Sequence, residues 1–260
     1  MKYIIGNWKM HLGIRESVAL ARGVLRSLRG KEVAPEVIIC PSFTALSEIH
    51  KVTARSRVRI GAQNCGPERM GSFTGETSTS MLEDIPCSFV IVGHSERRNQ
   101  LGETNELINK KLKTIFGLSK LTPILCVGEP MDVRDSANAM QYVAGQLKTA
   151  LDKVSISKNR QLIVAYEPVW AIGTGSPANI GDVVEMHQFI RSELNKITQL
   201  PARQISIIYG GSVDADNVYQ FLRESQIDGV LVGGASRKLQ QFDAIIKAGI
   251  DVMEAQAGKV

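Results

Sequence analysis

Eight short runs of apolar, mostly β-branched residues recur along this chain of 260 residues, and they constrain its fold more than any other feature. Most of the runs are apolar on both faces, which is typical of a strand buried on both sides of a parallel sheet. We therefore predict eight strands, at residues 3–5, 36–40, 58–62, 88–92, 123–127, 162–166, 205–209 and 229–232.

Amphipathic segments separate most of these runs, and their apolar spacing predicts helices at residues 17–28, 105–116, 139–151, 183–197 and 215–222. Segment 61–88 is more polar and rich in glycine, so we expect mainly loop with one short helix. Strands that alternate with helices form βαβ units and a parallel sheet. Eight such units without a linker favour an α/β fold, a single-domain (β/α)8 barrel over residues 1–260. A doubly wound sheet is the alternative that the same elements allow.

Composition excludes several classes of protein. The 31 basic and 26 acidic residues give a net charge of +5 without a basic run, so we expect no nucleic-acid partner. We find neither a signal peptide nor an apolar stretch of about 18 residues, so we expect no membrane partner. The four cysteines form no C-x-x-C pair, and we interpret them as reduced thiols of a cytoplasmic protein: Cys40, Cys65, Cys87 and Cys126.

Residues capable of chemistry follow five of the predicted strands. The active site of a (β/α)8 barrel lies at the carboxyl ends of its strands, so these residues are expected to share one rim. They are Asn7-Trp8-Lys9, Gly93-His94-Ser95-Glu96-Arg97-Arg98, Glu167-Pro168-Val169-Trp170-Ala171-Ile172-Gly173-Thr174-Gly175, Gly210-Gly211-Ser212 and Gly233-Gly234-Ala235-Ser236.

Each of these residue types suits the handling of a phosphorylated carbonyl compound. Glycine-rich turns let backbone N–H groups approach an anion, and turns after the last two strands match the usual phosphate site of a barrel. A lysine supplies a cation, a carboxylate can abstract a proton beside a carbonyl, and an imidazole can polarise the oxygens of the resulting enediolate. This set can move a proton between adjacent carbons without a metal or a redox cofactor.

The motifs of this rim closely resemble those of the triosephosphate isomerase family, in order from the first strand to the last. They are Gly6-Asn7-Trp8-Lys9-Met10, Gly61-Ala62-Gln63-Asn64, Phe73-Thr74-Gly75-Glu76, Val92-Gly93-His94-Ser95-Glu96-Arg97-Arg98, the stretch from Ala165 to Gly175, Tyr209-Gly210-Gly211-Ser212-Val213 and Val232-Gly233-Gly234-Ala235-Ser236. The resemblance implies a TIM barrel and a glycolytic and gluconeogenic isomerase that interconverts dihydroxyacetone phosphate and D-glyceraldehyde 3-phosphate. It implies no cofactor and no metal.

The resemblance also implies a role for each matching residue. Glu167 resembles the base that abstracts the proton, and His94 resembles the electrophile, a neutral imidazole. Asn7 and Lys9 resemble the pair that contacts the substrate, and Glu96 resembles the acid that orients them.

Further roles follow from the same resemblance. The residues that resemble the phosphate grip are Gly173, Ser212, Gly233 and Gly234. The mobile lid covers residues 168–178, including Pro168, Val169, Trp170, Ala171, Ile172, Thr174 and Gly175, with Tyr209 and Ser212 as its latch. Ile172 and Leu231 match the apolar residues that clamp the base. The loop of Phe73, Thr74, Gly75 and Glu76 resembles one that docks into a second subunit, which implies a homodimer.

The chain departs from the family at three places. His11 stands where the family usually has asparagine, and Arg237 stands where it usually has leucine. The far end of the lid reads Ser176-Pro177-Ala178, without the usual lysine. Proline fixes φ and restrains the preceding residue, which bears on the motion of the lid.

Other functions are weighed against this one. An isomerase of a four-carbon keto-sugar phosphate would use the same base, imidazole and phosphate grip, and a non-catalytic phosphate-binding barrel could retain the glycines. A G-x-G-x-x-A dinucleotide fingerprint fits residues 173–178 but does not directly follow its strand. His94-Ser95-Glu96 lacks the P-C-x-x-C of a zinc deaminase.

We interpret His11, His50 and His187 as structural or solvated, and Arg97 and Arg98 as structural partners of acidic groups.

Overall fold

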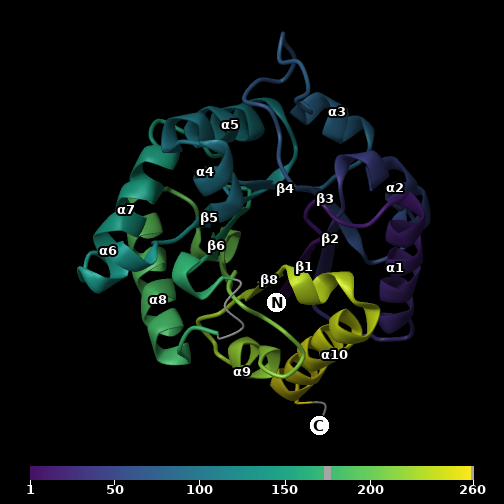
Figure 1. The fold of residues 1–260 in the computed structure, drawn as a ribbon. Helices are drawn as coiled ribbons and strands as arrows, with labels where there is room; N and C mark the ends of the chain where they lie inside the picture. The colour runs from purple at the N-terminus through teal and green to yellow at the C-terminus, as the bar shows by residue number, and fades with distance from the viewer. Residues whose placement is uncertain (173–176, 259–260) are drawn as a thin grey trace.

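The computed structural model describes residues 1–172 and 177–258. Within these residues eight parallel strands pair in chain order, and β8 pairs with β1 to close a barrel that a ring of helices surrounds (Figure 1). The strands are β1 (Tyr3–Asn7), β2 (Glu36–Cys40), β3 (Arg59–Ala62), β4 (Phe89–Val92), β5 (Thr122–Val127), β6 (Leu162–Tyr166), β7 (Ile205–Tyr209) and β8 (Gly229–Val232). The predicted barrel is confirmed, and closure excludes the doubly wound sheet because an open sheet keeps two edges.

The helices follow the strands in alternation. The α-helices are α1 (Ile14–Ser27), α2 (Leu46–Thr53), α3 (Thr79–Asp84), α4 (Ser95–Leu101), α5 (Asn105–Leu118), α6 (Met131–Asp135), α7 (Ala139–Ala150), α8 (Ile180–Ile197), α9 (Val218–Leu222) and α10 (Leu239–Gln256). Four short 3₁₀ segments complete the set: η1 (Phe43–Ala45), η2 (Val169–Ala171), η3 (Ala202–Gln204) and η4 (Gly234–Arg237). None of these helices is long and apolar enough to cross a lipid bilayer.

Every predicted strand is present, and each boundary differs by two residues at most. The first strand continues to Asn7 rather than ending at Ile5, because Gly6 and Asn7 pair with Ile39 and Cys40 of β2. Asn7 is therefore fixed by the barrel itself, at the carboxyl end of β1.

The predicted helices are also present, and capping explains where their boundaries differ. The helix predicted from residue 183 begins at Ile180, because the side chain of Asn179 accepts the N–H of Gly181 at 2.8 Å. The helix predicted from residue 215 begins only at Val218, because the carboxylate of Asp214 accepts backbone N–H groups of the preceding turn. Helices α2, α4, α6 and α10 were not predicted.

Two apolar layers explain why the strand runs are apolar on both faces. Ile5, Ile163 and Leu231 belong to a cluster made of strand residues that fills the barrel. Their neighbours Ile4, Val164 and Val230 face outward and pack with apolar residues of the surrounding helices. Because successive side chains of a strand point to opposite faces, both layers must be apolar.

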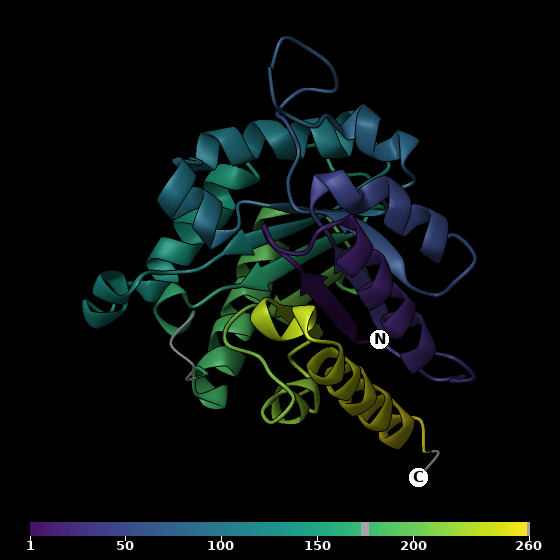
Figure 2. The same cartoon turned by 45° about the vertical axis from the view of Figure 1, so that its right-hand side comes forward.

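The loop between β3 and α3, residues 63–78, projects from the body of the molecule (Figure 2). It belongs to the segment predicted as mainly loop with one short helix, and α3 is that helix. The loop stands beside the rim rather than over it.

His187 of α8 is a structural histidine, as expected. It is buried, its Nδ1 lies 3.2 Å from the carbonyl oxygen of Gln226, and its ring meets that of Tyr166 edge to face. Desolvation lowers the pKa of His187 from 6.5 to about 3. The folded protein therefore holds this ring neutral at pH values well above 3.

Acidification is expected to destabilise the protein through His187. Between pH 6.5 and pH 3 the unfolded chain binds a proton that the folded chain excludes, so stability falls with pH by up to about 1.4 kcal/mol per unit. Urea unfolding of the wild type and of His187→Gln at pH 7 and pH 5 measures how much of the free energy of unfolding is lost through His187. We expect the difference in free energy of unfolding between the two proteins to fall by about 2 kcal/mol. A difference that stays constant would contradict this reading of His187.

Candidate active site

A cavity of about 860 Å³ opens at the carboxyl ends of the strands. It brings together most of the site residues predicted from the sequence. Those that line it are Asn7, Lys9, His94, Glu96, Glu167, Val169, Ile172, Ser212, Leu231, Gly233 and Gly234.

Lys9 is held in an unusual backbone conformation just after β1. Its φ is +53°, a left-handed value that is unfavourable for a residue with a side chain. Two side chains stabilise this turn: Oδ1 of Asn7 accepts the N–H of Lys9 at 3.0 Å, and Nε2 of Gln63 donates to the carbonyl of Lys9 at 2.8 Å. The turn directs the lysine side chain into the cavity. Gln63 is part of the motif Gly61-Ala62-Gln63-Asn64, from which no role for this side chain was predicted.

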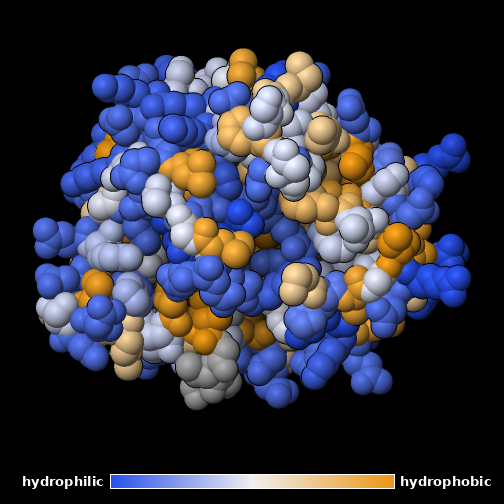
Figure 3. Space-filling model, turned by 45° about the horizontal axis from the view of Figure 1, so that its top comes forward, coloured by the Kyte–Doolittle hydropathy of each residue, from blue (hydrophilic) through white to orange (hydrophobic). Residues whose placement is uncertain are grey.

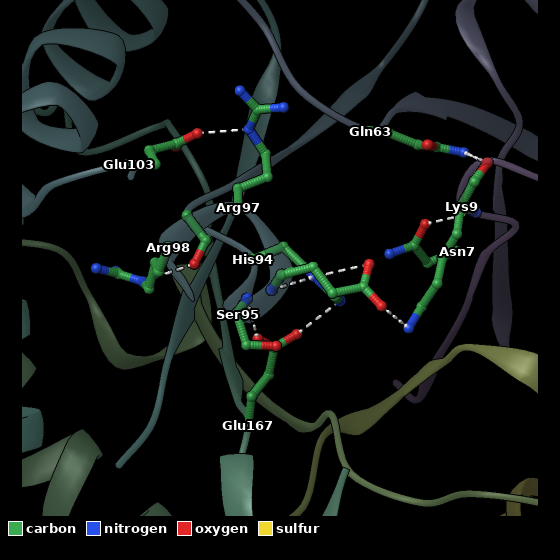
Figure 4. Close-up of polar contacts among 11 residues, drawn as sticks. Asn7, Lys9, Gln63, His94, Ser95, Arg97, Arg98, Glu103 and Glu167 are labelled. Carbon is green, nitrogen blue, oxygen red and sulfur yellow. Dashed lines mark hydrogen bonds and ion pairs between the residues drawn. The ribbon is translucent and has the colours of Figure 1, made fainter. Parts of the chain in front are cut away.

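The ammonium of Lys9 pairs with the carboxylate of Glu96 at 2.5 Å (Figure 4). Partial burial by itself raises the pKa of Glu96, but the hydrogen bond and charge of Lys9 outweigh it, so this pKa lies below its ordinary value. Glu96 is therefore a carboxylate near neutral pH, and it fixes the position of the Lys9 ammonium.

His94 lies at the junction of β4 and α4 and is 7% exposed. Its Nδ1 accepts the backbone N–H of Glu96 at 3.3 Å, so the proton of the neutral ring belongs on Nε2. Nε2 lies 3.2 Å from Oε1 of Glu167. The local backbone thus turns the N–H side of the imidazole toward the carboxylate.

Glu167 directly follows β6 and is 2% exposed. The backbone N–H of Ser95 donates to its Oε2 at 2.8 Å (Figure 4), whereas its Oε1 accepts no hydrogen bond within the described residues. Oε1, which faces Nε2 of His94, has no backbone donor and is therefore the oxygen available to take up a proton. The contact of Ser95 with the base was not predicted, because its donor is a backbone N–H, which nearly every residue type has.

Two glycines make room for Glu167. A Cβ at Gly128 would lie 1.7 Å from the carbonyl oxygen of Glu167, and a Cβ at Gly210 would lie 2.8 Å from its Cγ. Both glycines stand at the ends of the strands that flank β6, so a larger residue at either place would displace Glu167.

Cys126 packs in the barrel below Glu167, as expected of a core residue on the fifth strand. Complete burial, and then the negative charge of Glu167, raise the pKa of Cys126 well above its ordinary value. The thiol stays protonated beside the carboxylate.

The near end of the predicted lid is anchored by Glu129, which sequence reasoning missed. Oε1 of Glu129 accepts a hydrogen bond from the indole N–H of Trp170 at 2.8 Å and from the hydroxyl of Tyr166 at 3.0 Å. The backbone carbonyl of Glu129 accepts the N–H of Val169 at 3.1 Å. Pro168 precedes this segment at the start of η2. Glu129 follows β5 at the same rim, so its position after a strand was a signal available in the sequence.

The predicted latch residues bind the ends of the lid segment. The hydroxyl of Tyr209 accepts the N–H of Ala178 at 3.1 Å, and the hydroxyl of Ser212 donates to the carbonyl of Ala171 at 2.7 Å. Gly173, Thr174, Gly175 and Ser176 lie outside the described residues. Because η2 stands between β6 and this segment, the dinucleotide fingerprint lacks its required strand.

Other predicted residues lie away from the cavity. Phe73 to Glu76 belong to the projecting loop. Arg97 pairs with the acidic Glu103 at 2.5 Å, as expected, whereas Arg98 forms no ion pair within the described residues and donates instead to the carbonyls of Gly93 and Cys126. Two departures from the family pattern do line the cavity, His11 and Arg237. Within the described residues, no group of three or more His, Cys, Asp or Glu side chains could hold a metal ion.

The cavity combines a buried carboxylate with a free oxygen, an imidazole N–H that faces it and a fixed ammonium. Such a set suits the abstraction of a proton beside a carbonyl and the stabilisation of the charge that then develops on oxygen. Fold and site together are those of a (β/α)8 barrel equipped for acid–base chemistry at its carboxyl rim.

Comparison with known proteins identifies the family. The model of the triosephosphate isomerase family matches residues 2–249. Triosephosphate isomerase of Herpetosiphon aurantiacus is 44% identical over 245 residues, which cover 94% of this chain and 97% of that protein. The enzyme of Magnetococcus marinus is 43% identical over 246 residues, which cover 94% and 96%. The crystal structure of triosephosphate isomerase from Bartonella henselae superimposes with a TM-score of 0.83 at 30% identity and covers 95% of this chain and 98% of that one. The chain belongs to the triosephosphate isomerase family.

Proposed function

We propose that this protein interconverts dihydroxyacetone phosphate and D-glyceraldehyde 3-phosphate by proton transfer through an enediolate. The observation that carries the proposal is the unbonded Oε1 of Glu167, which lies 3.2 Å from Nε2 of His94 inside the cavity. The names of its relatives supply the substrate, because each is a triosephosphate isomerase.

The roles divide among the residues around the substrate. Oε1 of Glu167 takes the proton from one carbon and returns it to the next. The Nε2–H of His94 donates to the substrate oxygens as they gain negative charge, and the ammonium of Lys9 stabilises the same charge. Asn7 holds the turn that carries Lys9, and Glu96 holds its ammonium.

The phosphate group is proposed to lie beside Ser212, Gly233 and Gly234, which line the cavity. Ile172 and Leu231, which line the cavity near Glu167, are proposed to shield the base from water. A closed lid strengthens every electrostatic interaction within and keeps the enediolate from losing phosphate.

A coupled assay tests the reaction. Glyceraldehyde 3-phosphate and the erythrulose phosphates are supplied in parallel, and kcat/KM is compared between them. We expect the three-carbon substrate to have the higher value. A four-carbon substrate with the higher kcat/KM would replace the named reaction with that of a keto-sugar phosphate isomerase, because only pocket size separates the two.

We also propose that the protein is a homodimer that docks through the projecting loop. Large apolar side chains are exposed on this loop, Met70 at 73% and Phe73 at 42%, and Met10, which follows β1, is 94% exposed. Figure 3 shows a group of apolar residues in the upper right of one face of the molecule, and others scattered over its centre and lower part. Contiguous exposed apolar surface marks protein–protein interfaces.

Replacing Phe73 with glutamate is expected to weaken this dimer. A charge buried in an apolar interface is unfavourable, so the dissociation constant should rise by about tenfold or more. Light scattering at micromolar concentration measures the change. Tyr219→Glu on α9 is the control, since Tyr219 is 49% exposed and should leave the dimer intact. A wild-type protein that is a fully active monomer would refute the proposed dimer.

A cytoplasmic location is proposed from the cysteines. All four are buried and unpaired. Burial raises the pKa of Cys40 and Cys65, so both stay protonated and unreactive. Thiols of this kind suit a reducing compartment.

A further inference from the structure

Arg237 is a cation in the cavity that the site described above does not use. It ends η4, which directly follows β8, and its half-buried side chain lines the same cavity as Glu167 and Lys9.

The guanidinium of Arg237 lies next to Gly234, the first residue of η4, and Lys9 lies next to Gly233, the residue before it. A Cβ added to Gly234 would lie 3.7 Å from Nη2 of Arg237, and a Cβ added to Gly233 would lie 3.3 Å from Cε of Lys9. The two glycines therefore stand between two cationic side chains. Because they carry no side chains, a ligand can approach their backbone closely.

No hydrogen bond or ion pair joins the side chain of Arg237 to another of the described residues. Its Nε is buried and has no hydrogen-bond partner among them. Lys9, in contrast, is paired with Glu96. Asp214 and Asp216 also line the cavity, but neither forms an ion pair with Arg237, and Oδ1 of Asp214 accepts N–H groups of its own turn. The buried Nε is out of reach of a ligand, but the terminal Nη groups of this half-buried, cavity-lining residue also have no hydrogen-bond partner among the described residues, and they are the donors that an acceptor in the cavity can meet.

We propose that Arg237 binds the phosphate group of the substrate, on the side of Gly234 away from Lys9. The planar guanidinium can donate two parallel N–H bonds to phosphate oxygens and keeps its charge at every working pH. This inference rests on the proposed function for the identity of the substrate. The phosphate does not react during proton transfer, so the contact strengthens binding of substrate and transition state alike. Arg237 therefore sets KM rather than kcat.

Two variants of Arg237 test the proposal, Arg237→Leu and Arg237→Lys. We expect Arg237→Leu to raise KM for glyceraldehyde 3-phosphate about tenfold, the loss expected for a hydrogen bond to a charged group, with kcat within about threefold of the wild type. Arg237→Lys keeps the positive charge but cannot donate two parallel N–H bonds, so its KM should rise less than that of Arg237→Leu. Arg55→Leu removes an exposed charge between α2 and β3, away from the cavity, and should change neither constant.

A binding measurement separates this inference from the proposed function. Glycerol 3-phosphate has the phosphate but no carbonyl, so it cannot react, and calorimetry gives its Kd for each protein. We expect Kd to rise about tenfold in Arg237→Leu, in step with KM. An unchanged Kd and KM, a loss confined to kcat, or a wild type that does not bind the probe would each overturn the role of Arg237. If the wild type binds the probe but does not turn over glyceraldehyde 3-phosphate, the proposed function fails while the calorimetry still decides on Arg237. Circular dichroism verifies folding, and Arg237→Gln replaces any variant that does not fold.

Discussion

Replacing Glu167 with glutamine lowers kcat for glyceraldehyde 3-phosphate by about 10²–10⁴-fold, the range expected when a positioned base is lost. The amide cannot take up a proton at neutral pH. Its carbonyl oxygen can still accept the N–H of Ser95, which donates to Oε2 of the natural carboxylate at 2.8 Å. The fold should therefore survive, and the loss should fall on kcat with little change in the melting temperature.

Glu185→Gln is the matched control for this change. Glu185 is an exposed residue of α8 outside the cavity, so the same loss of charge there should leave kcat unaltered. Near-normal turnover by Glu167→Gln, with the control also active, would remove Glu167 from the role of base. The isomerase activity itself would then need another proton acceptor in the cavity.

Replacing Gly128 with alanine is expected to have the second-largest effect, although Gly128 touches no substrate. The new methyl group would overlap the carbonyl oxygen of Glu167, at 1.7 Å. The two chain segments at Gly128 and Glu167 cannot move apart without loss of a hydrogen bond, because the N–H of Glu167 donates to the carbonyl of Val127 at 2.7 Å. We expect a loss of about 1–3 kcal/mol in the free energy of unfolding, as for other overpacked sites. A shift of Glu167 by about 1 Å should also lower kcat about 100-fold.

Two further glycine variants separate crowding at the base from a general effect of alanine. Gly145→Ala lies in α7, where nothing stands within 4 Å of the new Cβ, and should stabilise the protein by about 0.5–1 kcal/mol at unchanged kcat. Gly210→Ala would meet the Cγ of Glu167 at 2.8 Å, a side chain rather than backbone, and should lower kcat with a smaller loss of stability. Equal kcat in Gly128→Ala and the wild type would show that Glu167 tolerates the displacement.

The strands were predictable because both of their faces are buried, and burial on both faces requires runs of consecutive apolar residues. A barrel strand faces the interior on one side and the helices on the other, so runs such as β2 and β6 are apolar throughout. The long helix α10 carries a comparable signal, with Phe242, Ile245, Ile246 and Ile250 buried at helical spacing, and the same reasoning could have found it. Helix α2, in contrast, has only eight residues, too short a span for periodicity to be decisive.

The candidate site was predictable to the level of which residues share the rim, because every strand of a closed parallel barrel ends on the same side. The contacts among them were not predictable in this way. Ser95 reaches Glu167 through a backbone N–H across 72 residues of chain, and Glu129 reaches Trp170 across 41. Such pairs exist only once the barrel has closed.

The sequence by itself determined the eight-stranded barrel, the family and the set of residues at its carboxyl rim, because apolar periodicity and local motifs depend on neighbours along the chain. Only the tertiary structure decided which oxygen of Glu167 is free, which glycines give that residue room and that Arg237 stands unpaired beside Gly234. Those properties depend on atoms that different strands bring within a few ångströms of one another, and no local pattern encodes such distances.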